Sequence, residues 1–333
     1  MSNEIPLIPR IPQGLRDAAQ RGTLIPFVGA GASVLGGCPT WSKLADDALT
    51  ACIKAEKFNH GQHEQIRHLG PRMKLSIARA IEAEHNLRID YAKLIEPEDY
   101  SGNTVGRRIY RSLGKLAKTF VTTNYDAWLD TEILEGKASV ADAIETGDST
   151  SAAPRTRRRI IDPNEFTAAN LNQDNCVFHL HGSVSDPPGM VMTTRDYIRH
   201  YANDRNSDDP SLENRTLTFL DFLFQRKTVL FVGYGLEDLE ILEYVVQKAK
   251  QQSSSGPPQA RHFMVQGFFA HQYELMQSMT QYYAQTDIEL LPFRRDQRDW
   301  AQLIEVLEDY GKELPAKTTL GLQKRMEMES LLD

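Results

Sequence analysis

Short apolar segments that end at glycine or at polar residues recur along the chain, and a helical pattern follows most of them. The clearest are residues 24–28, 119–122, 176–180 and 228–232. Buried strands that alternate with helices are typical of a parallel sheet covered by helices on both faces. The pattern therefore predicts an α/β fold, a Rossmann-like doubly wound parallel sheet, with ligands outside the carboxyl ends of its strands.

The same pattern assigns most of the remaining chain. The sequence predicts strands at 262–265 and 288–291, and helices at 41–53, 127–134, 193–225 in two pieces, 238–248, from 271, and 300–310. Residues of about 55–118 are helical and charged, which predicts an inserted α-helical subdomain. Residues of about 136–174 predict a mobile loop excursion. We expect one catalytic domain over 1–312 and a charged tail over 313–333.

Composition and charge exclude several classes of protein. Of the 333 residues, 41% are hydrophobic and 25% are charged, which is typical of a soluble globular chain. The net charge of -7 gives no basic field, so we expect no direct nucleic-acid binding. No run approaches the ~18 apolar residues of a membrane helix. Three scattered cysteines and the lack of a signal peptide predict a cytoplasmic protein without a disulfide framework.

A glycine turn, Gly29-Ala30-Gly31, follows the first predicted strand. Glycines at a strand-to-helix junction let backbone N–H groups approach a diphosphate, while a purely structural tight turn is the alternative. Ser33 and residues 36–41, which include Thr40, extend the loop into a candidate flap over a ligand. No Gly-Lys-Ser/Thr follows, which excludes a Walker loop, and the acidic position of a dehydrogenase fingerprint falls in a helical region.

Asn124 and Asp126 lie on either side of Tyr125 at the end of the second predicted strand. Asparagine supplies a neutral donor and acceptor, and aspartate can fix backbone or sugar hydroxyls. Both residue types are also favoured as helix caps, which is the structural alternative for this triplet.

His179 and His181 lie two apart on a predicted strand and so point to one face. His181 precedes Gly182 and a loop, so we expect its imidazole at the mouth of a pocket, where it is suited to act as a general base. His179 is deeper and is expected to be a core histidine with its hydrogen bonds satisfied. We expect no metal site, because no third ligand has suitable spacing.

Four motifs occur in a fixed order, each at the end of a predicted strand. They are VGAGAS at 28–33, TTNYD at 122–126, HLHG at 179–182 and VGYGLED at 232–238. Together they resemble the motifs of the sirtuin superfamily, over roughly residues 24–240. The resemblance supports the Rossmann-like fold and implies that NAD is the ligand.

The resemblance also implies roles for single residues. It implies contacts to the NAD diphosphate from Gly29, Ala30, Gly31 and Ser33, a further NAD contact from Thr40, contacts to the nicotinamide ribose from Asn124 and Asp126, contacts on the adenosine side from Gly233 and Gly235, and a base at His181. The hydroxyl residue common in the last motif of the superfamily is Gly235 in this chain.

The sequence departs from protein-deacylating sirtuins at two points. Those enzymes carry two Cys-x-x-Cys pairs that bind structural zinc, and this chain contains no Cys-x-x-Cys. Where they have Gly-Ile-Pro-Asp-Phe, this chain has Gly37-Cys38-Pro39-Thr40-Trp41, so the acidic residue is replaced. With the helical insertion and the tyrosine of the TNYD motif, the chain instead resembles bacterial sirtuin-like NADases, including those of anti-phage defence.

Cleavage of the nicotinamide–ribose bond needs no general acid, because nicotinamide leaves as a neutral molecule after an oxocarbenium-like transition state. The reaction needs a neutral amide to hold ribose and orient water, and a base, which Asn124 and His181 supply. Asp126 then either adds favourable electrostatics or anchors the loop. The sequence thus predicts an NAD+ glycohydrolase that yields nicotinamide and ADP-ribose without a metal.

The resemblance further implies an abortive-infection effector that forms homo-oligomers and works with a separately encoded partner, such as a HerA-type ATPase or an Argonaute-like protein. Two alternatives remain open. The first alternative is an NAD-dependent deacylase or ADP-ribosyltransferase. The second is a sensor that binds NAD or ADP-ribose without turnover.

Overall fold

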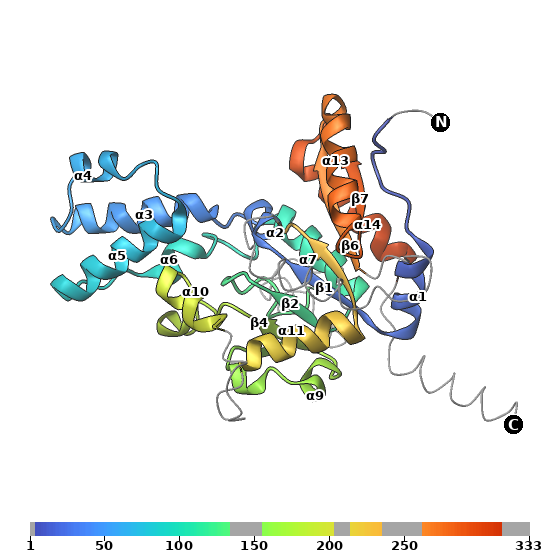
Figure 1. The fold of residues 1–333 in the computed structure, drawn as a ribbon, viewed down its shortest axis with the longest axis horizontal. Coiled ribbons are helices and arrows are strands. Elements are labelled where there is room, and N and C mark those ends of the chain that lie inside the picture. The colour runs from blue at the N-terminus through green and yellow to red at the C-terminus, as the bar shows by residue number, and fades with distance from the viewer. Residues whose placement is uncertain (1–3, 134–154, 203–213, 235–261, 315–333) are drawn as a thin grey trace, which may run out of the picture.

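The computed structural model describes residues 4–133, 155–202, 214–234 and 262–314. In these residues seven strands form one entirely parallel sheet with the order β3-β4-β2-β1-β5-β6-β7 (Figure 1). The strands are β1 (Leu24–Val28), β2 (Phe120–Thr122), β3 (Arg158–Ile160), β4 (Cys176–His179), β5 (Thr228–Val232), β6 (His262–Phe268) and β7 (Ile288–Arg294). The predicted parallel sheet is confirmed.

Helices cover both faces of this sheet. The α-helices are α1 (Gln13–Arg21), α2 (Ala30–Leu35), α3 (Trp41–Lys54), α4 (His60–Gln65), α5 (Pro71–His85), α6 (Tyr91–Ile95), α7 (Thr104–Leu116), α9 (Ala168–Leu171), α10 (Thr194–His200), α11 (Arg215–Arg226), α13 (Tyr273–Ala284) and α14 (Gln302–Glu313). Short 3-10 turns are at Pro163–Glu165, Pro187–Gly189, Ala270–Gln272 and Asp299–Ala301. Residues alternate along each strand, so one face packs on α1, α7 and α14 and the other on α9, α11 and α13.

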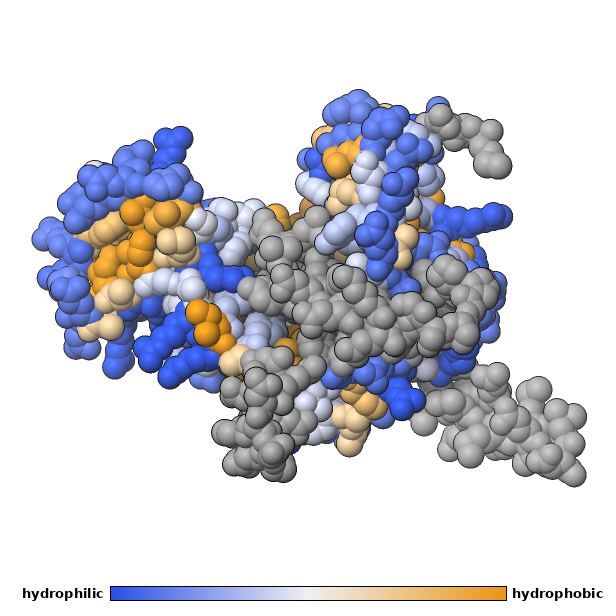
Figure 2. All heavy atoms as spheres, viewed as in Figure 1, coloured by the Kyte–Doolittle hydropathy of each residue, from blue (hydrophilic) through white to orange (hydrophobic). Residues whose placement is uncertain are grey.

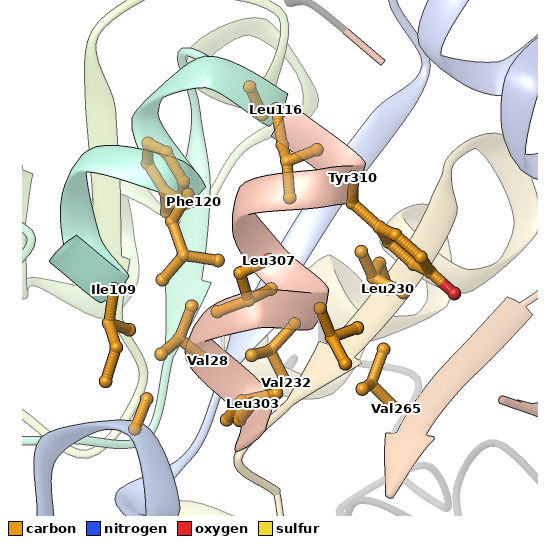
Figure 3. Packing of buried hydrophobic residues seen from close by; sticks show 14 of the residues in the cluster. Val28, Ile109, Leu116, Phe120, Leu230, Val232, Val265, Leu303, Leu307 and Tyr310 are labelled. Atoms are coloured by element: carbon orange, nitrogen blue, oxygen red, sulfur yellow. The ribbon is translucent and has the colours of Figure 1, made fainter. Parts of the chain in front are cut away.

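The first of these cores is shown in Figure 3. Leu303 and Leu307 of α14 pack against Val28 and Val232 of the two central strands. Apolar residues recur at helical spacing on the inner side of α7 as well, which fixes how that helix lies on the sheet. The two-sided cover confirms the doubly wound architecture.

A second group of helices forms its own core beside the sheet. Residues of α3, α5 and α6 pack together and against Tyr125, Val184, Met190 and Met192, which belong to loops at the carboxyl edge of the sheet. In Figure 1 this helical unit projects to one side. The residues of the predicted insertion, about 55–118, therefore divide between two cores, because α7 packs on the sheet.

The chain order of the strands indicates a ligand crevice at the centre of the sheet, at the carboxyl ends of the strands. After β4 the chain crosses to the far side of β1 to form β5, which makes the β1–β5 boundary the point where the strand order reverses. Ligands of doubly wound proteins bind outside the carboxyl ends of the strands at such a point. The segments that follow β1, β2 and β5 meet there.

Three local predictions are wrong. Residues 29–41 are not one long loop, because Gly29 is the N-cap of α2. Residues 127–133, described for the predicted helix 127–134, form a turn and a bridge, since the Arg157 guanidinium takes the Leu129 and Thr131 carbonyls that a helix would use. The predicted loop excursion 136–174 is described from residue 155, and this part contains regular structure, the edge strand β3 and the helix α9.

Other predictions are confirmed or lie outside the described residues. The strands at 228–232, 262–265 and 288–291 and the helices at 41–53, from 271 and at 300–310 are present, and 193–225 forms two helices. The helix 238–248, most of the tail 313–333 and Gly235 lie outside the described residues. Over the described part of the chain, no helix has the length and apolar character needed to cross a bilayer.

Candidate functional site

The glycine turn after β1 packs directly on the end of β5. The Gly29 N–H donates to the Val232 carbonyl (2.9 Å), and the Gly31 N–H donates to the Gly233 carbonyl (2.7 Å). A β-carbon on Gly29 would lie 2.7 Å from that same Gly233 oxygen. Glycine is therefore required for close approach of two backbones, and two of the N–H groups expected to face a diphosphate are bonded to β5 in this arrangement.

Gly233 completes this junction from the other side. Its φ angle is +61°, and a β-carbon there would collide with the backbone of Gly31 and Ala32. Thr40 lies elsewhere: its side chain accepts the Lys43 N–H (3.2 Å) as the N-cap of α3. Contacts of Gly29, Ala30, Gly31, Thr40 and Gly233 with NAD stay predictions.

Asn124 joins β2 to the glycine turn. Its amide nitrogen donates to the Gly29 carbonyl (3.0 Å) and to Ser33 Oγ (2.7 Å). Because a carbonyl oxygen only accepts, the contact with Gly29 fixes which atom of the amide is the nitrogen. Within the part of the chain that the structure describes, Oδ1 receives no hydrogen bond. Asn124 is not a helix cap here, and it presents an acceptor oxygen at the crevice.

Ser33 is the centre of a buried polar network. Its hydroxyl lies 2.8 Å from the hydroxyl of Tyr110 and accepts a hydrogen bond from the Asn124 amide (2.7 Å). The same hydroxyl acts to lower the pKa of the neighbouring Asp126 carboxyl. Ser33 is 3% exposed and Asn124 is 7% exposed, so the geometry of the network is set without solvent.

Asp126 is buried beside this network, and desolvation raises the pKa of its carboxyl above the ordinary value. Hydrogen bonds from Ser33 and from the Trp128 N–H (3.1 Å) oppose that rise. The bond to Trp128 also anchors the turn that follows. The predicted loop-anchoring role is thus present in the structure, together with a carboxyl group close to Asn124.

His179 is the buried, satisfied histidine that the sequence predicts. It has no exposed surface, and its ring lies between the Asn124 carbonyl oxygen (Nδ1, 2.9 Å) and Asp130 Oδ1 (Nε2, 2.9 Å). Arg159 of β3 pairs with the other carboxylate oxygen of Asp130 (3.4 Å).

The predicted position of His181 at a pocket mouth is wrong, because its side chain is enclosed by aromatic rings. It is 2% exposed, with Nε2 2.7 Å from the Tyr201 hydroxyl and Nδ1 3.4 Å from that of Tyr197. His200 also lies against it, and burial followed by the charge of His181 lowers the pKa of His200 to about 3. The sequence did not reveal this enclosure, since α10 follows His181 by more than ten residues.

Tyr125 separates the two clusters. Its ring contacts His181 (6.5 Å between centroids) and stacks on Trp41 of α3 (5.7 Å), and its hydroxyl donates to the Val191 carbonyl (2.7 Å). The structure therefore brings Gly29, Ser33, Asn124, Asp126 and Gly233 into one contact network, and it places His181 in an adjoining aromatic one.

A family model for the SIR2-like domain matches residues 118–288, just over half of the chain. The chain belongs to the SIR2-like domain family. The matched segment contains three of the four sequence motifs, and the remaining one, the glycine turn, bonds to that segment through Gly233 and Asn124. No curated protein sequence matches the chain.

Membership of the SIR2-like family indicates an NAD-related activity. In the described ranges no group of three or more His, Cys, Asp and Glu side chains is arranged to hold a metal ion. Sequence reasoning missed Tyr110, Asp130, Tyr197 and Tyr201 as parts of this SIR2-like site. No local motif marks them, because they reach the site from α7, from the turn after β2 and from α10 with the residue after it.

Proposed function

We propose that this SIR2-like chain is an NAD+ glycohydrolase that cleaves NAD to nicotinamide and ADP-ribose. The observation that carries the proposal is the fixed amide of Asn124. Both hydrogens of the amide are held by Gly29 and Ser33, so Oδ1 is the group presented to a ligand. A neutral acceptor in a fixed position suits a sugar hydroxyl or an attacking water, and it does not trap a cationic intermediate.

The reaction balances without a general acid. The C–N bond between nicotinamide and ribose breaks with its electron pair on nicotinamide, which leaves neutral, while positive charge develops on the ribose. Water then adds to the sugar carbon and loses one proton to a base. Asn124 orients that water, the nearby Asp126 carboxylate stabilises the developing charge, and His181 accepts the proton.

The enclosure of His181 sets a condition on this mechanism. The Tyr201 hydroxyl lies at hydrogen-bond distance from Nε2, so water or a ribose hydroxyl must take its place or pass a proton through it. Tyr197 and Tyr201 belong to α10 and the residue after it, and α10 packs on α5 of the helical unit. Binding of NAD therefore includes a small rearrangement of α10.

The same enclosure favours one second candidate, a sensor that binds NAD or ADP-ribose without turnover. Both ring nitrogens of His181 already face tyrosine hydroxyls, which is an arrangement that suits a non-reacting histidine. A deacylase has no comparable support, since the chain lacks a Cys-x-x-Cys pair and has Thr40 at the acidic position of the flap.

We extend the proposal to an anti-phage effector in the cytoplasm that assembles with itself and with a separately encoded ATPase or Argonaute-like partner. Its support is the resemblance of the motifs and an exposed apolar surface on the helical unit (Figure 2). Met73 of α5 is 51% exposed, and Ile198 of the adjoining α10 is 67% exposed. Light scattering that gave a monomer at micromolar concentration would count against self-assembly.

The deciding experiment follows nicotinamide release from NAD by chromatography, with and without the product of the neighbouring gene. We expect Asn124→Ala and His181→Ala to lose release by ~100-fold or more. Asn59→Ala is the matched control, because Asn59 only caps α4 and its loss leaves the site intact. Equal rates in wild type and both site variants would contradict the assignment. Tight ADP-ribose binding without product would support the sensor, and acetyl-ADP-ribose from an acetylated peptide would support a deacylase.

A further inference from the structure

We propose that His179 is a positioning residue that holds the backbone of Asn124 in its reactive place, and that Asp130 holds the other side of the His179 ring. The inference rests on the proposed function, since it concerns the residue that orients water. His179 itself touches no ligand in this scheme. It acts through the main chain of Asn124, behind the crevice.

The first step is the set of hydrogen bonds around Asn124. Its N–H donates to Thr122 Oγ1 (3.0 Å), and its carbonyl oxygen lies 2.9 Å from His179 Nδ1. The Thr122 hydroxyl in turn donates to the Val28 carbonyl of β1 (2.7 Å). Both main-chain polar groups of Asn124 are therefore fixed from the sheet, in addition to the two hydrogens of its side chain. Such complete restraint defines the position of Oδ1.

The second step is the tautomer of His179. A carbonyl oxygen only accepts, so Nδ1 must carry a hydrogen for the 2.9 Å contact with Asn124 to be a bond. A carboxylate at Nε2 alone would draw the single hydrogen of a neutral ring to that nitrogen and leave Nδ1 bare. Both contacts of the ring are therefore hydrogen bonds only if a charged ring donates from both nitrogens, or if a protonated Asp130 donates to Nε2 of a neutral ring. In both arrangements the hydrogen on Nδ1 is retained.

The third step is the support of Asp130 itself. Arg159 of β3 pairs with Oδ2 of this carboxylate at 3.4 Å and also reaches the Ser183 hydroxyl (3.5 Å). Asp130 is 7% exposed, so Arg159 compensates a buried charge. The edge strand β3 thus supports a chain of side chains that runs through Asp130 and His179 to the main chain of Asn124.

Two substitutions at His179 separate positioning from simple burial. An asparagine side chain places an N–H where His179 has Nδ1, whereas a glutamine side chain places its amide where His179 has Nε2. We expect His179→Asn to keep the bond to Asn124 and retain kcat for nicotinamide release within about fivefold, whereas His179→Gln lowers kcat ~100-fold with little change in KM. Asp130→Asn should behave like His179→Asn, because its amide can donate to Nε2 and leave the hydrogen of a neutral ring on Nδ1.

His262→Gln is the matched control. His262 is another buried strand histidine with a bond to a backbone group, the Val229 N–H (3.2 Å), and it lies on β6 away from Asn124. The His262→Gln variant should be less stable than wild type, but its folded fraction should have an unchanged kcat. Equal losses in the asparagine and glutamine variants of His179, or losses that follow the melting temperature, would overturn the proposal.

A readout independent of turnover distinguishes this proposal from the proposed function. Hydrogen–deuterium exchange over residues 123–128 should be faster in His179→Gln than in wild type and unchanged in His179→Asn. If wild type releases no nicotinamide, the glycohydrolase proposal fails, and the exchange data alone then decide the positioning role. Identical exchange in the two His179 variants would refute that role.

Discussion

The two candidate catalytic side chains are held in different ways. Asn124 is fixed by the Gly29 carbonyl at the end of β1, by the buried Ser33 hydroxyl and by the His179 side chain of β4. His181 is fixed by tyrosine hydroxyls that come from α10 and the residue after it. The first set of partners lies on the sheet and on α2, which follows β1 directly, and the second set lies on an element that packs on the helical unit.

This difference shows where the site can change and where it cannot. Backbone atoms at strand ends move only if the sheet moves, so the Asn124 side is built in when the domain folds. The hydroxyls around His181 sit on side chains of a seven-residue helix, which can shift without disturbing the strands. We therefore expect substitutions of the partners of Asn124 to remove activity, and substitutions of the tyrosine hydroxyls around His181 to modulate it.

Gly233→Ala should have the largest effect. The residue has a φ of +61°, and its β-carbon would collide with the backbone of the glycine turn that Asn124 contacts. We expect a loss of ~3 kcal/mol in the free energy of unfolding, from the left-handed conformation and the collision together, with loss of nicotinamide release. Urea titration and the release assay measure the two effects.

Gly22→Ala is the control for that substitution. Gly22 has nearly the same φ, +68°, but its β-carbon would meet nothing within 4 Å. It should lose only ~1 kcal/mol and keep full activity. If both variants lost the same stability, close packing between β5 and the glycine turn would not be what holds the Asn124 side together.

Ser33→Ala should reduce nicotinamide release by ~100-fold, because the Asn124 amide loses an acceptor and the Asp126 carboxyl loses the hydroxyl that lowers its pKa. Tyr110→Phe removes only the hydroxyl behind Ser33 and leaves its ring stacked on Trp128 (5.1 Å), so we expect a loss of about tenfold or less. Steady-state kinetics on both variants give the ratio. A larger effect from Tyr110→Phe than from Ser33→Ala would show that Ser33 is not the centre of the network.

The fold could be predicted because its strands are short, apolar and bounded by glycine or polar residues. The strand 228–232 is predicted with both ends correct for this reason. Where the predicted secondary structure is wrong, a tertiary contact is the cause. Residues 127–133 have a helical pattern, but Arg157 binds two of their carbonyls from a distant segment, and no local signal marks that arginine as buried.

The candidate site also has a part that the sequence predicts and a part that it does not. Asn124 and Gly29 follow strands that are parallel neighbours, so the sequence alone predicts that they meet. The surroundings of His181 depend on the path of α10 over the carboxyl edge, which no spacing rule gives. Thr40 is an opposite case. The family resemblance implies that it contacts NAD from a flap, but in the structure its side chain caps helix α3.

Tyr201→Phe tests the His181 side. The change removes one hydroxyl, 2.7 Å from Nε2, and keeps the ring in the aromatic enclosure. We expect nicotinamide release to stay within about tenfold of wild type, since the substrate or water replaces this hydroxyl in the proposed reaction. A loss as large as that of Ser33→Ala would mean that Tyr201 takes part in proton transfer. The Tyr201 hydroxyl would then be as necessary to the reaction as the partners of Asn124.

Asp126→Asn should have the smallest effect on stability and the clearest dependence on pH. Burial raises the pKa of the Asp126 carboxyl in the folded chain above the unfolded value of about 3.9, so the folded state binds this proton more tightly than the unfolded state does. Below about pH 4 both states are protonated and the group costs nothing. As the pH rises from there toward the folded pKa, wild type loses stability, while asparagine does not titrate.

The melting temperature of Asp126→Asn relative to wild type should therefore increase by a few degrees from pH 4 to pH 8. Differences at each pH cancel the titration of all other groups, which makes scanning calorimetry of the pair sufficient. A difference that is constant with pH would mean that Ser33 and Trp128 offset the desolvation of the carboxylate completely. Asp126 would then be an ionised anchor throughout, and the Asn124 side would hold its carboxylate at no cost in stability.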